Sequence, residues 1–210
     1  MHCFIFRRVD RREYIIKRIT SDPDWENIPA LQVDNHLWLP SEQIEMAAQI
    51  CYDDENLYVR MVAVEPDIRA EYTAPLSKVC EDSCMEFFFC PHPDDDRYMN
   101  IEINPNCASH IGVGSCRADS VRIIPKDEDT LLQKKTRRTD DGWELTYRIP
   151  VFFLRSLFPG YALESGTVIR ANCYKCGDLT AKPHYLSWNP VVNSTPDFHR
   201  SCDFGTMILE

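Results

Sequence analysis

Apolar and polar residues alternate along four segments of the chain, in the pattern of a strand with one buried face. The same segments carry many aromatic and β-branched side chains, which favour extended backbone. They are Cys84–Phe89, Tyr98–Asn104, Trp143–Ile149 and Val168–Lys175. Five weaker segments of this kind are Met46–Tyr52, Leu57–Val64, Leu131–Thr139, His184–Trp188 and Phe204–Leu209. The chain is therefore predicted to consist mainly of short strands.

One segment has a helical pattern instead. Residues Pro150–Phe158 read PVFFLRSLF, with proline at a position suited to a first helical turn. Acidic and glycine-containing turns at Asp53–Asn56 and Asp140–Gly142 separate the predicted strands. Many short strands with frequent turns are typical of a sandwich or barrel. We therefore expect an all-β fold with one short helix, in a single domain that spans residues 1–210.

Polar residues occupy one face of two consecutive predicted strands. In residues 98–104, Asn100 and Glu102 alternate with apolar residues that turn to the core. In the preceding strand, Glu86 lies between Cys84 and Phe88 on one face. A short connection joins the two strands, which favours an antiparallel hairpin. If their apolar faces match, Glu86 lies beside Asn100 and Glu102 on the opposite face.

A third predicted strand presents residues of the same kind. Arg170, Asn172 and Tyr174 share one face of the segment 168–175. Three strands thus offer carboxylate, amide, guanidinium and phenol groups on faces that we expect to be open. Such a set of donors and acceptors suits a ligand with many hydroxyl groups, provided that the three faces converge.

Composition excludes several classes of protein. The formal net charge is −10, so the chain lacks the basic face that binding to nucleic acid requires. Uninterrupted apolar runs reach four residues, as in Val151–Leu154, whereas a membrane-spanning helix needs ~20. The N-terminal sequence MHCFIFRRVDRREY has no apolar core or cleavage site typical of a secretory signal. We therefore expect a cytoplasmic protein whose ten cysteines are reduced, most of them small buried groups.

Several motifs, in order, resemble the family-9 carbohydrate-binding modules and their single-domain relatives. They are Asp82–Phe88, Tyr98-x-Asn100-x-Glu102-x-Asn104, Trp143-Glu144 up to Ile149-Pro150, Arg170–Asp178, Trp188, Pro196–His199 and Phe204-Gly205. The order and spacing extend from about Trp25 to the C-terminus. The resemblance implies a β-sandwich of two antiparallel sheets, of the jelly-roll kind, that binds a mono- or oligosaccharide without cleaving it. It also implies a role in carbohydrate catabolism and a structural calcium ion.

The resemblance also implies which residues contact the sugar. Members that bind sugar are expected to hold a terminal ring between two tryptophans, and Trp188 matches the later one. The earlier position is Cys80, which leaves Tyr72 or another loop aromatic to supply a second ring. The family's polar contacts match Glu86, Asn100 and Tyr174 by position. With the neighbours on the same strand faces, the predicted ligand-binding residues are Trp188, Glu86, Asn100, Glu102, Arg170, Asn172 and Tyr174.

Two other functions stay open. Glu86 and Glu102 supply the two carboxylates that a glycoside hydrolase needs, although hydrogen-bond acceptors for hydroxyl groups are the preferred interpretation. Related sandwich folds hold haem through Met and His for electron transfer, but Met85 and Met99 are predicted to face the core.

Four further sets of residues have a structural and a functional interpretation. The acidic turns Asp53–Glu55 and Asp94–Asp96 carry oxygens that suit calcium, although a solvated turn is the preferred interpretation. Cys173-x-x-Cys176 and His199-x-x-Cys202 have zinc-like ligands at unsuitable separation. His199 is interpreted first as a hydrogen-bonded loop anchor. Trp143 is predicted to be a core residue, and Trp25 and Trp38 to be packing residues.

Overall fold

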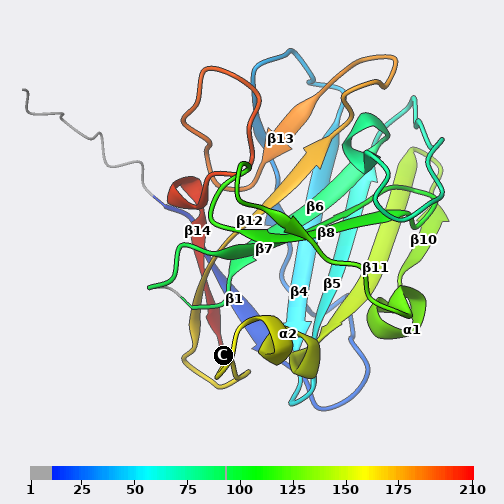
Figure 1. Ribbon diagram of the computed structural model, residues 1–210. Coiled ribbons are helices and arrows are strands. Elements are labelled where there is room, and N and C mark those ends of the chain that lie inside the picture. The colour runs from blue at the N-terminus through cyan, green and yellow to red at the C-terminus, as the bar shows by residue number, and fades with distance from the viewer. Residues whose placement is uncertain (1–10, 93) are drawn as a thin grey trace, which may run out of the picture.

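The computed structural model describes residues 11–92 and 94–210, which form two β-sheets packed face to face (Figure 1). We call them the front sheet and the back sheet. The front sheet has the order β14-β12-β6-β7-β8-β9, with β13 and β3 at the side of β12. Its strands are β14 (Gly205–Leu209), β12 (Val168–Cys176), β6 (Cys84–Cys90), β7 (Tyr98–Ile103), β8 (Ser109–Gly114), β9 (Val121–Arg122), β13 (Tyr185–Ser187) and β3 (Asn35–His36).

The back sheet has the order β10-β11-β5-β4, and β2 pairs with β4. Its strands are β10 (Lys135–Arg138), β11 (Gly142–Pro150), β5 (Asn56–Val64), β4 (Glu45–Tyr52) and β2 (Leu31–Gln32). The predicted β-sandwich is confirmed. All pairings between these strands are antiparallel.

Strand β1 (Glu13–Arg18) belongs to both sheets. Its first four residues run parallel to β14, and Lys17 and Arg18 run parallel to Cys51 and Tyr52 of β4. The two sheets are therefore continuous through one strand. These two parallel pairings modify the expected pattern of wholly antiparallel sheets.

The helical segments are short. The predicted helix at residues 150–158 is present as α2 (Val151–Leu157), with Pro150 at its N-cap. A second helix, α1 (Glu128–Leu132), takes the start of the segment predicted as a strand at Leu131–Thr139, and β10 begins only at Lys135. The side chain of Asp127 accepts the backbone N–H of Thr130 and so caps α1. Two 3₁₀ turns, η1 (Val79–Glu81) and η2 (Ser201–Asp203), complete the elements.

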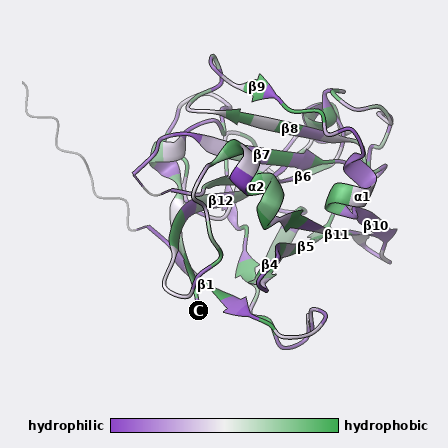
Figure 2. Ribbon diagram, turned by 60° about the horizontal axis from the view of Figure 1, so that its bottom comes forward, coloured by the Kyte–Doolittle hydropathy of each residue, from purple (hydrophilic) through white to green (hydrophobic). Residues whose placement is uncertain are grey.

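The main core lies between the two sheets. Every second residue of β6 and β7 points into it, including Met85, Phe87 and Met99, and Trp143 enters from β11 with no exposed surface. Helix α2, hydrophobic in Figure 2, adds Phe153 and Leu154 at one end. The predicted core positions of Met85, Met99 and Trp143 are confirmed.

A second, smaller apolar cluster covers the outer face of the front sheet, which the sequence predicts to be open. The segment between β13 and η2 lies over this face and contributes Val191 and Phe198. They pack with residues that point outward from the sheet, such as Phe88, Tyr98 and Tyr174. The polar residues on this face are therefore largely buried, and the expectation of an open face is wrong for most of its area.

The described cysteines number nine, and none of them forms a disulfide. Among the described residues, no helix combines the length and apolar character needed to cross a membrane.

Candidate functional site

The antiparallel hairpin β6–β7 fixes the positions of the central polar residues. Glu86 is opposite Glu102, and Phe88 is opposite Asn100. Because paired residues point to the same side of a sheet, Glu86, Asn100 and Glu102 share the outer face. The predicted register and shared face are confirmed.

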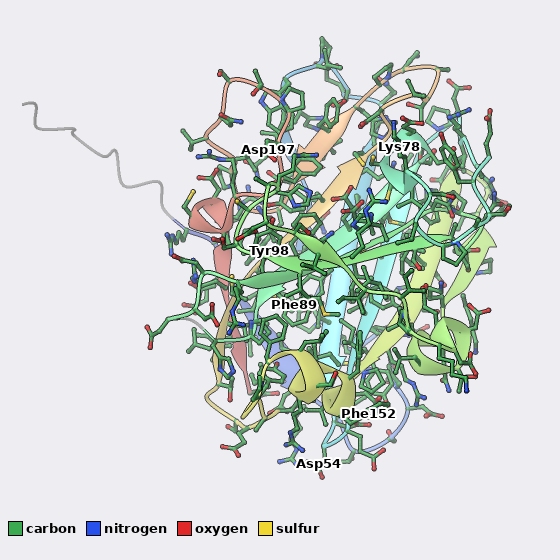
Figure 3. The ribbon with its side chains drawn as sticks, viewed as in Figure 1. Asp54, Lys78, Phe89, Tyr98, Phe152 and Asp197 are labelled. Carbon is green, nitrogen blue, oxygen red and sulfur yellow. The ribbon has the colours of Figure 1, made fainter. Side chains whose placement is uncertain are left out.

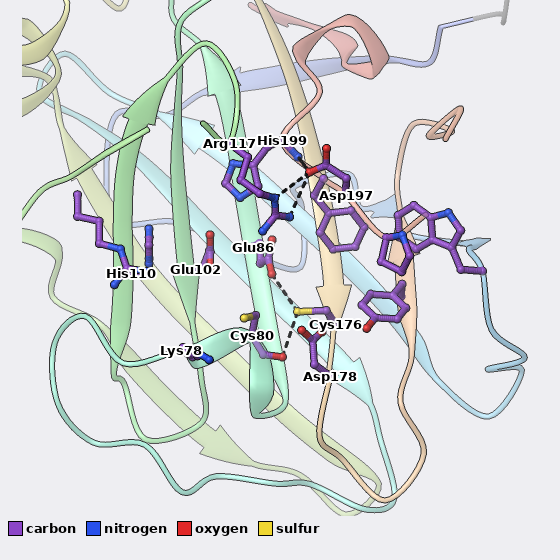
Figure 4. Close-up of a pocket in the computed structure, with 15 residues that line it drawn as sticks. Lys78, Cys80, Glu86, Glu102, His110, Arg117, Cys176, Asp178, Asp197 and His199 are labelled. Carbon is purple, nitrogen blue, oxygen red and sulfur yellow. Dashed lines mark hydrogen bonds and ion pairs between the residues drawn. The ribbon is translucent and has the colours of Figure 1, made fainter. Parts of the chain in front are cut away.

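A pocket of about 250 Å³ opens on this outer face, above Glu86 and Glu102 (Figure 4). Two of its lining residues, Lys78 and Asp197, lie at the end of the molecule opposite Phe152 of α2 (Figure 3). The pocket is lined by Trp38, Lys78, Cys80, Glu86, Glu102, His110, Arg117, Arg122, Cys176, Asp178, Tyr185, Pro196, Asp197, Phe198 and His199.

The floor of the pocket consists of buried acidic groups. Glu86 is 2% exposed and accepts a hydrogen bond from the Cys176 thiol at 2.9 Å. Glu102 is 7% exposed and accepts a hydrogen bond from the Asn100 side-chain amide at 2.8 Å. Burial raises the pKa of Glu86 well above its ordinary value, and it raises the pKa of Glu102 to about 7. Burial also raises the pKa of Asp178.

An aromatic wall stands on one side of this floor. The Trp38 ring lies 5.4 Å from the Tyr185 ring and 5.6 Å from the Phe198 ring, measured between centroids. Its indole N–H donates to the Asn193 carbonyl at 2.8 Å. Behind the wall, Tyr174 stacks on Phe198 at 4.1 Å. The wall is therefore held in place by ring packing and a backbone hydrogen bond.

Basic residues and histidines surround the rest of the pocket. Arg117 forms an ion pair with Asp197 at 3.1 Å, which joins the segment after β8 to the segment over the front sheet. His199 shares a hydrogen bond of 2.7 Å with the Tyr98 hydroxyl, as expected for a loop anchor. Burial lowers the pKa of His110 and of His199 to about 4, so both rings are neutral at pH 7.

The Asp82 side chain organises the loop before β6. It is fully buried, and its Oδ2 atom accepts hydrogen bonds at 2.9 Å from the backbone N–H groups of Glu71 and Tyr72 and from the Asn104 amide. These hydrogen bonds give a structural reason for Asp82 just before β6 and Asn104 just after β7. The Tyr72 hydroxyl bonds to Glu81, and Tyr72 does not line the pocket.

Trp188 does not lie at this pocket. Its side chain is 3% exposed and belongs to the main core between the sheets. A Cβ atom at Gly205 would come within 2.6 Å of the Trp188 ring, so the ring fills the space that this glycine leaves. The prediction that Trp188 presents a strand-end ring to a ligand disagrees with this burial. The backbone N–H of Trp188 bonds to Cys173, which keeps the residue in the sheet.

The predicted residues of β12 share the outer face of the sheet but lie outside the pocket lining. Arg170 bonds to the carbonyl groups of Ser201 and Asp95, at the far end of the face. Asn172 holds the backbone of Asn189 through both side-chain atoms, at 3.0 and 2.8 Å. Tyr174 is fully buried behind the aromatic wall. Asn172 and Tyr174 support the segment over the pocket, and none of the three residues lines the pocket.

The calcium implied by the resemblance needs several oxygen atoms at one point. Asp53 Oδ1 instead accepts the backbone N–H groups of Glu55 and Asn56, at 2.8 and 2.7 Å, and Asp95 Oδ2 accepts from Arg97 at 2.9 Å. Within residues 11–92 and 94–210, one group of three ligating side chains gathers at a point, and two of its members are thiols. These carboxylates therefore hold their own turns, and the structural calcium ion stays a prediction.

The zinc-like motif noted in the sequence is not assembled. Cys173 points into the main core, whereas Cys176 points to the outer face of the same strand. Cys202 is exposed. Since alternate residues of a strand face opposite sides of the sheet, these residues do not converge.

Several lining residues are not among the residues predicted from the sequence. His110 is opposite Glu102 in the β7–β8 pairing, but β8 reads SHIGVG and lacks a clear alternation. Arg117 and Asp178 lie in loops, and Trp38 follows the two-residue strand β3. The position of Cys80, expected from the resemblance to face the ligand, does line the pocket.

Comparison with known proteins places this arrangement in a family. Residues 20–209 match the model of carbohydrate-binding family 9, and the chain belongs to that family. No protein with a curated description matches the chain.

Solved structures share the fold over nearly the whole chain. One is a protein from Bacteroides uniformis to which carbohydrate binding has been assigned provisionally. It is 25% identical to this chain and has a TM-score of 0.83. The match covers 95% of this chain and 100% of that chain. Two others are structures of a family-9 module from Caldicellulosiruptor kristjanssonii, in complex with cellotriose and with glucose. They are 14% and 13% identical and cover 95% of this chain and 94% and 96% of theirs, both with a TM-score of 0.68.

Proposed function

We propose that this protein binds carbohydrate, as a terminal sugar ring or short oligosaccharide, in the pocket above Glu86 and Glu102. The observation that carries the proposal is a pocket with polar groups on its floor and an aromatic wall at its side, in a chain of carbohydrate-binding family 9. Its volume of about 250 Å³ is below the ~300–1,000 Å³ typical of sites for larger ligands, which favours a ligand of about one ring.

The floor supplies groups that match sugar hydroxyls. A hydroxyl group both donates and accepts, so it forms hydrogen bonds with a carboxylate, a carboxyl, an amide or a neutral imidazole. Glu86, Glu102 and the neutral rings of His110 and His199 offer these groups within one pocket. Their burial strengthens each hydrogen bond by keeping water away.

We assign the stacking contact to Trp38, in place of Trp188. Trp38 lines the pocket, and its backbone has φ of 58°, which is strained for a bulky residue. Strained backbone of this kind is concentrated at functional sites. A ring at the pocket wall offers apolar area to the C–H face of a sugar.

We propose binding without cleavage. Glycoside hydrolysis needs one carboxyl that is protonated and one that is ionised, with their pKa values pushed apart. Here burial raises the pKa of both Glu86 and Glu102, and within residues 11–92 and 94–210 neither forms an ion pair that would hold it ionised as a nucleophile. The chain is then expected to release no reducing sugar from an oligosaccharide during long incubation.

Calorimetric titration with glucose and cellotriose tests the proposal. We expect dissociation constants near millimolar for the monosaccharide, which corresponds to only about −4 kcal/mol. Trp38→Ala and Glu102→Gln should each weaken binding severalfold or more. Glu45→Gln, at an exposed position on the back sheet, should leave binding unchanged. The assignment would be contradicted if no sugar of a panel bound, or if Trp38→Ala bound sugar with the affinity of the wild type.

A role in carbohydrate catabolism extends the same proposal. It requires that free monosaccharides and short breakdown products bind, in addition to intact polymer. Titration with a series of increasing chain length would measure this preference, and binding restricted to polymer would count against the catabolic role.

A further inference from the structure

Three metal-ligating side chains converge beside the pocket, and two of them, Glu86 and Cys176, line it. Cys84 and Cys176 are opposite each other in the pairing of β6 with β12, and Glu86 is two residues from Cys84 on the same face. Their two sulfur atoms and one Glu86 oxygen all lie within 4.8 Å of one another. All three residues are at most 2% exposed. Adjacent strands therefore hold these donors in a preformed group.

The surroundings of Glu86 lack a positive partner at close range. Its one hydrogen bond given by the structure comes from the Cys176 thiol, a weak donor, and within residues 11–92 and 94–210 it forms no ion pair. The neighbouring group across the hairpin is a second carboxyl, Glu102. A buried carboxylate needs a compensating charge, so this group is either protonated or bound to a cation.

We propose that Cys84, Glu86 and Cys176 form a binding site for a thiophilic divalent cation, with Zn²⁺ as the expected ion. Thiolate sulfur prefers Zn²⁺ over Ca²⁺ or Mg²⁺, and a carboxylate is an accepted third ligand. Bond lengths of ~2.3 Å to sulfur and ~2.0–2.2 Å to oxygen separate tetrahedral ligand atoms by roughly 3.5–3.8 Å. The observed group is within small side-chain movements of that arrangement.

Glu86 and Cys176 line the pocket, so we place the open fourth coordination position on the pocket side. Cys80 lines the same pocket, and its carbonyl accepts a weak hydrogen bond from the Cys176 thiol at 3.7 Å. A third cysteine thus lies next to the pair in the structure, at the position where the family resemblance expects an aromatic ring. Three protein ligands and one open position are also the arrangement of zinc sites that exchange a ligand.

Binding has a defined proton balance. Burial raises the pKa of the Cys84 thiol to about 12. The pKa of the Cys176 thiol is raised by the contact of Cys176 with Cys84 and by burial. Both are therefore protonated at pH 7 without metal. Zn²⁺ takes up two thiolates, so the two thiol protons leave to solvent, about two per ion.

Cobalt(II) titration provides a direct test, because thiolate ligands give Co²⁺ an intense charge-transfer absorption and tetrahedral coordination gives it visible bands. The full chain is used with Cys116 and Cys202, both exposed, and Cys3, outside the described residues, changed to serine. This removes three thiols that could bind metal independently. We expect one Co²⁺ per chain, displacement by Zn²⁺, and proton release that an indicator in weak buffer records.

Variants locate the site. Cys84→Ser and Cys176→Ser should each weaken Zn²⁺ binding about 100-fold or more, measured by competition with a chromophoric chelator, and Glu86→Gln should weaken it about tenfold or more. Cys90→Ser is the matched control, since Cys90 is equally buried on the same face of β6, near its other end. Far-ultraviolet circular dichroism of each metal-free variant checks folding, and Cys84→Ala and Cys176→Ala replace any serine variant that unfolds.

The proposal is overturned if no charge-transfer band appears, or if binding survives in both Cys84 and Cys176 variants. It is equally overturned if Cys90→Ser loses binding to the same extent. The metal site goes beyond the proposed carbohydrate binding and does not depend on it. Glucose is titrated into metal-free and into Zn²⁺-loaded protein, and Zn²⁺ binding is measured without sugar. Failure of sugar binding and failure of metal binding are then observed independently of each other.

Discussion

The Trp188 side chain packs between the two sheets, where its ring lies against Gly205 at the start of β14. The following residue, Asn189, is held by Asn172 of β12 and accepts the backbone N–H of Arg12. Motifs that are distant in the sequence, Trp188 and Phe204-Gly205, are thus packing partners. Their joint presence supports the fold and carries no information about the ligand.

Replacement of this ring should therefore reduce stability. We expect Trp188→Ala to lower the free energy of unfolding by about 3–5 kcal/mol, because it leaves a large cavity in the core. Urea denaturation followed by circular dichroism measures the loss, and Trp188→Phe should lose less. Trp38→Ala is the comparison: it should weaken sugar binding with a smaller loss of stability. If the Trp188→Ala protein were stable but no longer bound sugar, Trp188 would belong to the sugar-binding site.

The sequence was informative at the residue scale where alternation was clean. Glu86 and Glu102 could be placed on one face because any other register buries carboxylates among Phe and Ile. Trp188 could not be placed, since a strand-end tryptophan suits a core as well as a stacking site. Trp38 follows a strand of only two residues, and no periodicity marks it.

A buried polar cluster joins the ends of β5, β12 and β13 between the sheets. Lys175 Nζ lies 3.1 Å from Glu65 Oε2 and donates to His184 Nε2 at 2.8 Å. The Glu65 carboxylate also accepts from Ser83 at 2.6 Å and from the Trp143 indole at 3.0 Å. The cluster is nearly inaccessible to water, so each polar group depends on its partners.

This cluster predicts loss of stability in mild acid. Burial, together with the charge of Lys175, lowers the pKa of His184 to about 4, below its unfolded value of 6.5. A lowered folded pKa contributes stability that is present above pH 6.5 and is lost as the pH falls towards 4. Although burial acts to raise it, Lys175 and Ser83 hold the pKa of Glu65 below its ordinary value, so its contribution is also lost in acid.

Chemical denaturation at a series of pH values from 4 to 8 measures this dependence. His184→Gln, which keeps a hydrogen-bonding side chain but does not titrate, should flatten the curve between pH 6.5 and 4. His36→Gln, at an exposed position, should leave the slope unchanged. An equal slope in wild type and His184→Gln would show that other groups cause the acid sensitivity.

The segment over the front sheet is linked to the pocket through the Arg117–Asp197 ion pair. Arg117 is 65% exposed, so its pairing contributes about 1 kcal/mol or less to stability. We expect Arg117→Ala to leave the melting temperature nearly unchanged but to weaken sugar binding severalfold, since both residues line the pocket. Arg137→Ala, which removes an ion pair on the back sheet, is the control. Equal affinity of Arg117→Ala and wild type would make the link unimportant for binding.

At the element scale, strands with alternation or dense aromatic content were predictable, and so was α2. Strand β8 was not, because its glycines interrupt the pattern. A Cβ at Gly112 would come within 2.5 Å of the Asn100 side chain, so this gap in the pattern serves the packing of the site. Strand β1 mixes charged and apolar residues and joins the two sheets, so a search for one buried face misses it.

At the scale of the whole molecule, the sequence predicted a sandwich but not how its sheets are joined. Parallel pairing of β1 with β14 and β4 brings together segments that are nearly 200 residues and more than 30 residues apart. Neither local propensity nor a turn motif specifies such contacts. They follow from the global packing, in which Ile16 of β1 is fully buried in the common core.

This connection predicts that the two sheets unfold as one unit. Trp143 belongs to the back sheet, and the backbone of Trp188 is bonded to β12 of the front sheet. Two variants each keep one of these tryptophans, with the other three changed to phenylalanine, and so follow the two sheets one at a time. Their fluorescence transitions in urea should coincide with each other and with the loss of far-ultraviolet circular dichroism. Ile16→Ala should move both transitions to lower urea together, because the shared strand loses its core contact. The expected loss of free energy of unfolding is about 2–5 kcal/mol. Transitions at different urea concentrations, or a shift confined to one reporter, would mean that β1 does not couple the sheets.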